Sequence, residues 1–487
     1  MVNYGVSSAC GTCKRRRKKC DEHRPSCQRC IRAQRICLGY QSSSELQFRP
    51  YGNITATRPY RPALSDVYDV KMDSELEDRA LATFLDDYCL ASQSSDLVGS
   101  ILDDFKPIIV AADSSSDLAR AANITALASM GKKSSRPSLV NKARVLYTQF
   151  LESLQTRLAH GSISGTPESM LVIVLLGIFE MISATEEHAS NHGTHSQGVY
   201  ALLSTAGAPL FTLSWAGCFR KAFQSVLYSD DCLNQPSAHP LQSLDILFSR
   251  SSTVLRKIRT LLSAKVAIAE ELHTIMRTAS NLDDELANWA TTRLHRWQYR
   301  TIGKFDPLMT EFKEGFFWLF GRVDVYADLY ISTIWNTYRK VRLMIIDVIF
   351  SCASKLNMRN SFQPQVSTAQ DLVDDIAASL CFHLCADVPD LVRNAESGAP
   401  FCVTPGKSLG GLLLMHPLFI ASGLSITKVQ QRRNMREALV WIADHMGIGQ
   451  AQSLLKTPQE FPNETVADGY MLIWVGMLYK RELLQSV

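Results

Sequence analysis

The chain has 487 residues, 46% of them hydrophobic, and a formal net charge of +4 at pH 7, so it is long enough for two or three domains with a sizeable core. The small charge conceals an asymmetry: residues 10–37 contain ten lysines and arginines but only two acidic residues, whereas the rest of the chain carries 41 basic and 45 acidic residues. Because the positive charge is local, it indicates a nucleic acid partner for the N-terminal region and excludes a generally basic body.

The composition also argues against a membrane protein and a secreted protein. The longest apolar run, Met170 to Ile182, has 13 residues and includes Glu180, which is short of the roughly 20 that a bilayer needs. The first residues, MVNYGVSSAC, lack the apolar core of a signal peptide. We therefore expect no membrane partner, and we expect reduced core thiols at the seven later cysteines: Cys89, Cys218, Cys232, Cys352, Cys381, Cys385 and Cys402.

The most informative stretch is CGTCKRRRKKCDEHRPSCQRCIRAQRIC, in which a C-x2-C-x6-C unit occurs twice with six residues between the copies. A C-x2-C pair turns two sulfurs toward one centre, as in zinc sites. A disulfide framework would be expected in a secreted chain, and an iron–sulfur ligand set would need tighter spacings. The pattern therefore predicts zinc ligands at Cys10, Cys13, Cys20, Cys27, Cys30 and Cys37.

The number of sulfurs sets the number of metals. Six thiolates are too many for one tetrahedral zinc and too few for two separate ones. Two zinc ions need eight bonds, which six thiolates supply only if two of them bridge both metals. The sequence therefore predicts one shared cluster with two Zn2+ ions as cofactors and a formal charge of about −2. The basic run inside the first unit offsets this charge and leaves an excess of positive charge.

The basic run suits DNA binding. Arginine is the side chain best shaped for bidentate contact with guanine O6 and N7, and cations that meet phosphates contribute affinity that falls steeply with salt. Such a run is also typical of a nuclear import signal or of a solvated surface. We expect DNA contact by the six consecutive cationic residues, which are Lys14, Arg15, Arg16, Arg17, Lys18 and Lys19.

Residues 10–40 resemble the binuclear zinc cluster domain of fungal transcription factors. The similarity rests on all six cysteines, the basic run, Asp21 directly after the third cysteine and Pro25 two residues before the fourth. The resemblance implies a pair of short helices that hold two zincs, with one helix end in the major groove of double-stranded DNA.

The resemblance also implies roles for individual residues. The first and fourth cysteines bridge in the family, which corresponds to Cys10 and Cys27 here, and the other four are terminal ligands. Base contact would come from Arg16 and Arg17, while their basic neighbours would contact phosphates or balance the cluster. CGG-type triplets are the half-sites that the family suggests.

Residues 1–9 are expected to form an N-terminal tail, and residues 10–40 the cluster domain. Residues 41–73 are predicted to be a linker because they are polar and carry three prolines. From Ser74, where S-E-L-E has the form of a capping box, residues 74–487 are predicted to be helical, without strands. Leu76 to Tyr88 holds barely two heptads, so no dimerising coiled coil is expected. Helices are predicted over Ser116–Met130, Ser138–Leu158, Pro167–Ser183, Asn281 or Asp283 to Trp297, Leu329–Phe350 and Met435–His445, with loops at Asn357–Gln370 and Ala395–Gly411.

This helical region resembles the fungal-specific transcription factor regulatory domain. The residues that carry the similarity are LLGIFEM at Leu175–Met181; His195 with Gly198, Val199, Leu202 and Leu203; Trp335, Asn336, Tyr338, Arg339 and Arg342; Pro417 and Leu418; and Gly449, Gln450 and Ala451. The resemblance implies an all-helical regulatory domain without catalytic residues.

Other motifs have ordinary structural interpretations. His188, His192 and His195 fall on one face of a helix, but Asn191 and Gly193 interrupt it, so polar or core histidines are expected. The group Cys381, His383 and Cys385 alternates by two on an expected helix, which spreads the side chains over different faces.

Three further patterns also have ordinary structural interpretations. TPGKSLGG at Thr404–Gly411 lacks the first glycine of a phosphate loop and no strand precedes it, which favours a surface loop. FLDDY at Phe84–Tyr88 and ILDDF at Ile101–Phe105 could contact the transcription machinery, but their periodicity favours core helices. Arg339 and Arg342 are expected to anchor a buried helix.

Together these features predict an all-α protein: a two-zinc DNA-binding module, a linker and a large helical regulatory domain. The expected function is that of a nuclear, sequence-specific regulator of RNA polymerase II transcription without enzyme activity. The family resemblance implies regulation of a metabolic gene cluster. Expected partners are double-stranded DNA, the transcription machinery or co-regulators and a small-molecule effector, with the chain a monomer or a homodimer through its helical domain. The alternative is a helical ligand-sensing or scaffold protein whose cluster is an interaction module.

Overall fold

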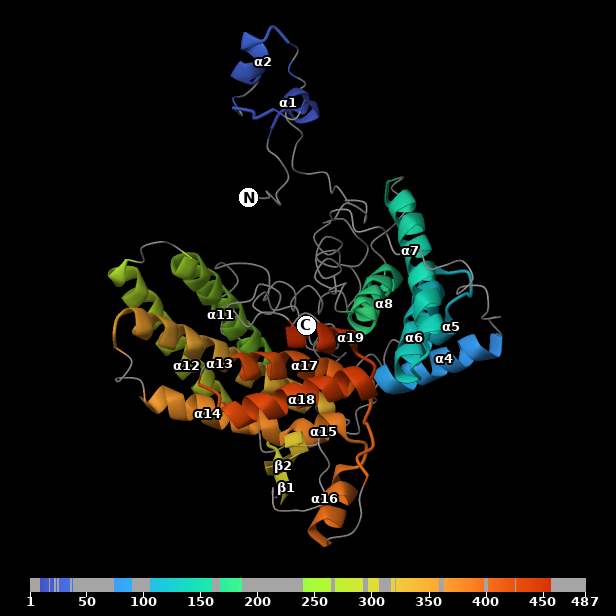
Figure 1. Cartoon of the computed structure of the whole chain (residues 1–487), viewed down its shortest axis with the longest axis vertical. Coiled ribbons are helices and arrows are strands. Elements are labelled where there is room, and N and C mark those ends of the chain that lie inside the picture. Colours follow the sequence, from blue (N-terminus) through green and yellow to red (C-terminus); the bar gives the residue numbers. More distant parts are fainter. Residues whose placement is uncertain are drawn as a thin grey trace. The chain divides into compact units, whose positions relative to one another are not determined.

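The computed structural model describes residues 9–16, 18–21, 23, 26–35, 37, 74–89, 106–159, 167–185, 240–263, 268–291, 297–305, 317–319, 321–358, 363–397, 402–424 and 426–456. The chain divides into two compact units, residues 1–61 and 62–487 (Figure 1). The prediction of an all-α protein, with a cysteine cluster followed by a large helical region, is confirmed. The predicted linker at residues 41–73 lies outside the described residues.

The first unit contains two one-turn helices, α1 (Gly11–Arg15) and α2 (Gln28–Arg32). In the described part of this unit the buried residues are cysteines alone: Cys10, Cys13, Cys27 and Cys30. A module this small cannot bury enough apolar surface to fold by itself, so its stability has to come from metal coordination.

The N-terminal part of the helical body packs around α6. Helix α6 (Asp117–Lys133) is capped at its N-terminal end by Ser116, whose hydroxyl accepts a hydrogen bond from the Ala119 N–H. Helices α7 (Pro137–Ala159) and α8 (Pro167–Ser183) both begin with proline, which is preorganised for a first helical turn. Helix α6 contacts α4, α5, α7 and α8. The helices are α4 (Ser74–Tyr88), α5 (Lys106–Ala111), α6 (Asp117–Lys133), α7 (Pro137–Ala159) and α8 (Pro167–Ser183).

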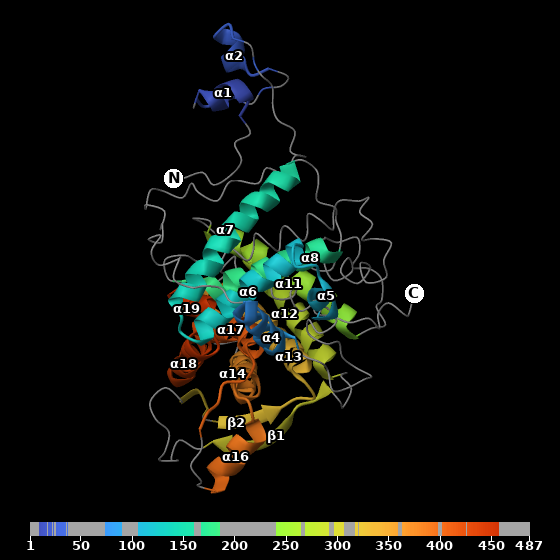
Figure 2. The same ribbon diagram turned by 90° about the vertical axis from the view of Figure 1, so that its right-hand side faces the viewer.

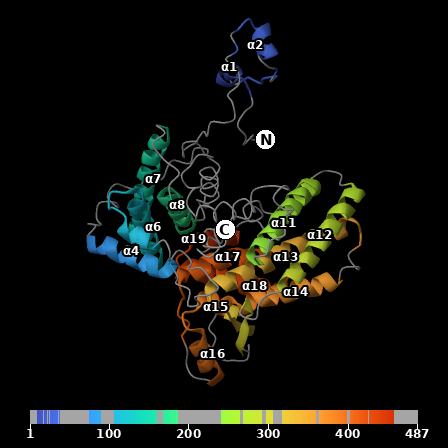
Figure 3. The same ribbon diagram turned by 180° about the vertical axis from the view of Figure 1, so that it is seen from behind.

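Most of the remaining helices pack against α13 or α17, which Figure 3 shows from behind, whereas α16 contacts the strand β1 (Arg300–Phe305). They are α11 (Pro240–Ser263), α12 (Ala269–Thr291), α13 (Leu329–Lys355), α14 (Gln363–Ala378), α15 (Leu380–Leu384), α16 (Val388–Ser397), α17 (Ser408–Gly423), α18 (Val429–His445) and α19 (Gly449–Lys456). No described helix combines the length and apolar character that a membrane span requires.

Helix α17 is the centre of this body. It is buried along Ser408 to Ser422 and contacts α4, α13, α15, α18 and α19, so it is apolar all round rather than along one stripe. At its start the Lys407 ammonium pairs with Asp86, and the Ser408 hydroxyl donates to the Met446 carbonyl at 2.9 Å. The Lys407–Asp86 contact connects α4, early in the chain, with the start of an element more than 300 residues later.

Buried polar side chains fix the position of α13. Arg342 forms two hydrogen bonds with the Asp283 carboxylate, at 2.7 and 2.8 Å, and so ties α13 to α12. Arg339, 1% exposed, donates to Tyr326 Oη and to Asn336 Oδ1, and it lies 3.5 Å from Asp375 on α14. The prediction that Arg339 and Arg342 anchor a buried helix is confirmed.

A small antiparallel hairpin, absent from the sequence expectations, lies beside α14 and α16 (Figure 2) and also contacts α15. It consists of β1 (Arg300–Phe305) and β2 (Gly321–Val325), and the pairing register skips Ile302, which forms a bulge. Strands this short give little alternation, and the bulge interrupts what there is. The one-turn 3-10 helix η4 (Phe317–Leu319) lies before β2 and contacts α18 and α15.

Three predicted boundaries are wrong. Helix α12 begins at Ala269, well before Asn281, and buries the stripe Leu272, Ile275 and Met276. Helix α14 begins at Gln363, inside the predicted loop 357–370, with Pro364 in its first turn.

The third wrong boundary concerns the predicted loop 395–411, because α16 continues to Ser397 and α17 starts at Ser408. Gly410 lies inside α17, and glycine is needed there because a Cβ atom would clash with the His383 carbonyl oxygen. The interpretation of this glycine pair as a loop signal is thereby overturned.

We predict that Arg342→Ala lowers the stability of the body by about 3–5 kcal/mol, because it leaves the Asp283 carboxylate buried and unpaired. Arg250→Ala is the matched control, since the Arg250–Glu285 pair is more than one third exposed and such pairs contribute about 1 kcal/mol or less. Thermal unfolding followed by circular dichroism measures both. Equal losses for the two variants would contradict the assignment.

Candidate metal centre and nucleic-acid interface

The two cysteine units fold in the same way. Cys10 directly precedes α1 and Cys27 is the N-cap of α2, so the second cysteine of each unit lies in the first helical turn. The Cys13 N–H donates to Cys10 Sγ at 3.4 Å, and the Cys30 N–H donates to Cys27 Sγ at 3.3 Å. Each helix start therefore directs two sulfurs to one side, as the C-x2-C spacing predicts.

The sulfurs form two overlapping groups of four. In one group the sulfurs of Cys10, Cys13, Cys20 and Cys27 all lie within 4.8 Å of one another, and in the other those of Cys10, Cys27, Cys30 and Cys37 do. The two groups share the sulfurs of Cys10 and Cys27. The structure thus brings together all six sequence-predicted ligands.

The distances between sulfurs fit tetrahedral zinc. The Sγ atoms of Cys10 and Cys27 are 3.6 Å apart, those of Cys13 and Cys27 3.7 Å, and those of Cys10 and Cys30 3.9 Å. A tetrahedron with Zn–S bonds of about 2.3 Å has edges of about 3.8 Å, whereas a disulfide is about 2.05 Å long. All described cysteines are free thiols, so the donor set suits a thiolate-bound metal.

Crowding of the sulfurs opposes ionisation without a metal. Desolvation, together with hydrogen bonds to the sulfurs of Cys27 and Cys10, raises the pKa of the Cys30 thiol to about 12, and desolvation likewise raises the pKa of Cys10 and Cys13. Zinc binds the thiolate, so metal binding releases these protons and supplies the positive charge that the buried sulfurs need.

Asp21 connects the two units. Its carboxylate accepts hydrogen bonds from the backbone N–H groups of Gln28 at 3.0 Å and Arg29 at 2.8 Å, which belong to the first turn of α2, and from His23 at 3.2 Å. Desolvation alone would raise the pKa of Asp21, but these hydrogen bonds outweigh it and lower the pKa below its usual value. The carboxylate therefore caps α2 from the end of the first unit.

Arg29 makes a second connection, which sequence reasoning missed. Its guanidinium donates to the Lys19 carbonyl oxygen at 3.0 Å, so one residue bonds to Asp21 through its backbone and to the basic run through its side chain. No local pattern marks this residue, because its partners lie eight and ten residues away in the sequence.

The basic run begins in α1 and continues beyond it. Lys14 and Arg15 belong to α1, and the side chains of Arg15, Arg16, Lys18 and Lys19 are exposed, whereas Arg17 lies outside the described residues. The two helices end with equivalent backbone hydrogen bonds. The Lys18 N–H donates to the Cys13 carbonyl oxygen after α1, and the Arg35 N–H donates to the Cys30 carbonyl oxygen after α2.

The two units nevertheless differ in charge. Where the first unit has Lys14 and Arg16, the second has Ile31 and Ala33 at the corresponding positions. The first unit therefore presents the denser set of cations.

The other candidate motifs are structural where they are described. His383 is buried: Nδ1 donates to the Gly410 carbonyl at 3.1 Å, and Nε2 lies 2.8 Å from the Ser332 hydroxyl and 3.2 Å from the Asn336 amide. Desolvation, aided by the charge of Arg339, lowers the pKa of His383 to about 4, so the ring is neutral at pH 7. Hydrogen bonds rather than a metal account for this histidine.

Phe84 to Tyr88 form part of α4 with Phe84, Leu85, Asp87 and Tyr88 buried, which confirms the core interpretation of that motif. Among the later cysteines, Cys89, Cys352, Cys381 and Cys385 are buried as predicted, but Cys402 is exposed, so its assignment to the core is wrong. The histidines at 188, 192 and 195, the ILDDF segment, Cys218 and Cys232 lie outside the described residues.

Two groups of four sulfurs with two members in common, next to the exposed side chains of Arg15, Arg16, Lys18 and Lys19, define a binuclear zinc cluster. A family model described as the fungal Zn(2)-Cys(6) binuclear cluster domain matches residues 8–47. Transcription factor dbaG of Emericella nidulans is 31% identical over 411 residues, which is 83% of this chain and 97% of that protein.

Two shorter similarities have the length of the cluster module. White-opaque regulator 2 of Candida albicans is 51% identical over 46 residues, 9% of this chain and 10% of that protein. An uncharacterized transcriptional regulatory protein of Schizosaccharomyces pombe is 45% identical over 53 residues, 11% of this chain and 9% of that protein. No solved structure matches the chain.

The chain therefore belongs to the fungal transcription factors with a Zn(2)-Cys(6) binuclear cluster. It is a DNA-binding transcriptional regulator and not an enzyme, and its cluster binds two zinc ions. Factors of this family are generally nuclear. The predicted class, cofactor and DNA partner are thereby confirmed.

We predict that Asp21→Ala destabilises the zinc module without removing a ligand, because three backbone N–H groups lose their acceptor. Loss of a helix cap costs about 1–2 kcal/mol, which corresponds to several-fold faster zinc release. Zinc transfer from the full-length protein to a chromogenic chelator measures the rate. Asp21→Asn keeps one acceptor oxygen, so its rate of zinc release should lie between those of the wild type and Asp21→Ala. A wild-type rate for Asp21→Ala would contradict the capping role.

Proposed function

We propose that all six cysteines ligate the two zinc ions, with Cys10 and Cys27 bridging and Cys13, Cys20, Cys30 and Cys37 terminal. The observation that carries this proposal is the overlap of the two sulfur groups, whose shared members are Cys10 and Cys27. Two tetrahedra with a common edge use six sulfurs for eight bonds, which is the count that two zincs require.

In the proposed DNA complex Arg16 and Arg17 contact base edges in the major groove, and Lys14, Arg15, Lys18 and Lys19 contact phosphates. The exposure of Arg16 and its place directly after α1 support this division, because the end of a short helix can enter the groove while flanking cations meet the backbone. Arginine is suited to guanine, so we propose CGG-type half-sites.

Residues 74–487 are proposed to be the regulatory domain, residues 10–40 the DNA-binding domain and residues 41–73 the linker between them. The similarity to transcription factor dbaG extends over most of the chain and thus beyond the cluster, which supports a shared role for the body. The proposal includes nuclear localisation, control of a metabolic gene set, and a response to effectors or co-regulators. The chain acts as a monomer or as a homodimer through the body.

The bridging assignment predicts zinc stoichiometry. Cys10→Ser or Cys27→Ser removes a ligand from both metals, so the full-length variant should lose both zinc ions. Cys13→Ser or Cys37→Ser removes a ligand from one metal and should leave at least one zinc bound. Native mass spectrometry counts the ions, and equal zinc content in bridging and terminal variants would refute the assignment.

The DNA-reading assignment predicts separable effects on affinity and specificity. Arg16→Ala or Arg17→Ala should reduce the preference for duplexes with CGG half-sites by about 1–3 kcal/mol per guanine contact. Lys18→Ala should instead weaken binding to all duplexes alike and lower the salt dependence by about one phosphate. Fluorescence anisotropy at several salt concentrations measures both quantities.

Arg35→Ala is the matched control for these variants, because Arg35 ends the second unit as Lys18 ends the first. It should retain the CGG preference. If the preference survives Arg16→Ala, Arg17→Ala and Cys13→Ala, the cluster does not read sequence, and its role as a protein interaction module is favoured instead.

A further inference from the structure

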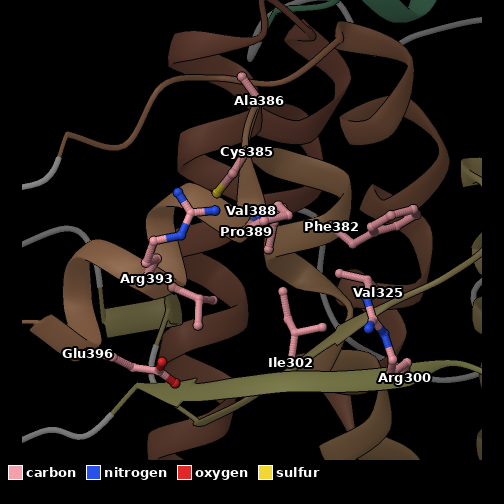
Figure 4. A pocket seen from close by; sticks show the side chains of 11 residues that line it. Arg300, Ile302, Val325, Phe382, Cys385, Ala386, Val388, Pro389, Arg393 and Glu396 are labelled. Carbon is pink, nitrogen blue, oxygen red and sulfur yellow. The ribbon is translucent and has the colours of Figure 1, made fainter.

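The helical body contains a cavity of about 490 Å³ between the hairpin β1–β2 and helices α15 and α16 (Figure 4). This volume lies within the range of about 300–1,000 Å³ that is usual for small-molecule sites. The cavity takes no part in the zinc cluster, and nothing in the proposed DNA contacts uses it.

The wall of the cavity is largely apolar. Ile302 on β1, Val325 on β2, Phe382 on α15 and Val388 on α16 line it. Ile302 is the bulged residue of β1, which the pairing register skips, and a bulge changes the direction of a side chain relative to its neighbours. Figure 4 shows Ile302 rising from β1 toward Val388. The apolar wall would accept the apolar body of a ligand.

The charged side chains that line the cavity lie at its two ends. Figure 4 shows Arg393 and Glu396 together on one side and Arg300 on the other. Arg393 already forms an ion pair with Asp390. Arg300 of β1 is paired with Val325 of β2 in the register of the hairpin. Its side chain forms neither a hydrogen bond nor an ion pair with the described residues. Within the described part of the chain, one end of the cavity therefore offers a guanidinium without an ion-pair partner next to apolar surface.

Both walls are held in place by other contacts. On the hairpin, Arg322 pairs with Asp324 and with Asp375 of α14, and the Thr301 hydroxyl donates to Asp324 at 2.7 Å. These bonds connect the strands to the helical core. The hairpin side of the cavity is therefore fixed without a ligand.

The α16 side is fixed as well. Gly303 allows β1 to approach α16 so closely that a Cβ atom there would lie 2.4 Å from Val392 Cγ1. Asp387 caps α16 by accepting from the Asp390 N–H at 3.0 Å, and Cys385 pairs with Pro405 in an isolated bridge. A cavity between two fixed walls requires little rearrangement to bind a ligand.

We propose that this cavity binds a small amphipathic carboxylate, with its apolar body against Ile302, Val325 and Phe382 and its carboxylate on the guanidinium of Arg300. Arginine and carboxylate are matched in geometry, and the pair forms charge-assisted hydrogen bonds. The inference deepens the proposed effector response of the body, but it is measured without DNA, so the DNA-reading proposal can fail or hold independently.

The test is isothermal titration calorimetry of the zinc-loaded full-length protein with octanoate and naphthoate as probes, each compared with its neutral primary amide. At least one carboxylate should bind at a single site per chain, and its amide should bind about tenfold more weakly or worse, because a charge-assisted hydrogen bond is lost. Absence of binding by both carboxylates, or equal binding of acids and amides, would overturn the proposal.

Variants then locate the site. Arg300→Gln should weaken carboxylate binding at least about tenfold, and Val325→Phe, which fills the cavity, should reduce binding of acid and amide alike. Lys304→Gln is the matched control, since it removes one positive charge from the same strand outside the cavity lining, and it should bind like wild type. Circular dichroism verifies folding, and binding that is unchanged in both Arg300→Gln and Val325→Phe would overturn the assignment.

Discussion

The cysteine-rich unit depends on the coordination of two zinc ions by its cluster of sulfurs. Coordination replaces a hydrophobic core there, since the buried residues of its described part are cysteines alone. The sulfurs of Cys10 and Cys27 lie at the starts of two short helices, where backbone N–H groups stabilise negative charge. The side chains of Arg15, Arg16, Lys18 and Lys19, at the end of α1 and directly after it, are exposed beside this cluster.

The helical body is held by a different kind of interaction. Its long helix α13 carries Arg339 and Arg342, whose partners Asp375 and Asp283 lie on the neighbouring helices α14 and α12. Buried ion pairs contribute less to stability than to the choice of one arrangement, because an alternative packing would leave a charge without its partner. The same network extends through Asp375 to Arg322 on the hairpin. Ion pairs therefore connect the hairpin, which forms one wall of the cavity, to α14 and α13.

Local patterns predicted the helices well where apolar residues recur and where a cap or proline marks the start. Ser116 and Pro167 are examples, and both helices start within a residue of the expected position. The errors arose where long-range packing overrides local preference. Gly410 and Gly411 indicate a loop by themselves but lie inside the buried helix α17, where glycine is needed because α15 and α18 pack too closely for side chains. The hairpin was missed because its strands are short and bulged.

The sequence by itself determined the chemistry of the metal centre and the class of protein, because ligand number, spacing and local charge are properties of a short continuous segment. It also determined which arginines would anchor α13. Only the tertiary structure decided how Asp21 and Arg29 join the two cysteine units, and that Arg300, Phe382 and Val388 border one cavity. These residues meet through contacts between separate elements, and no spacing along the chain encodes such contacts.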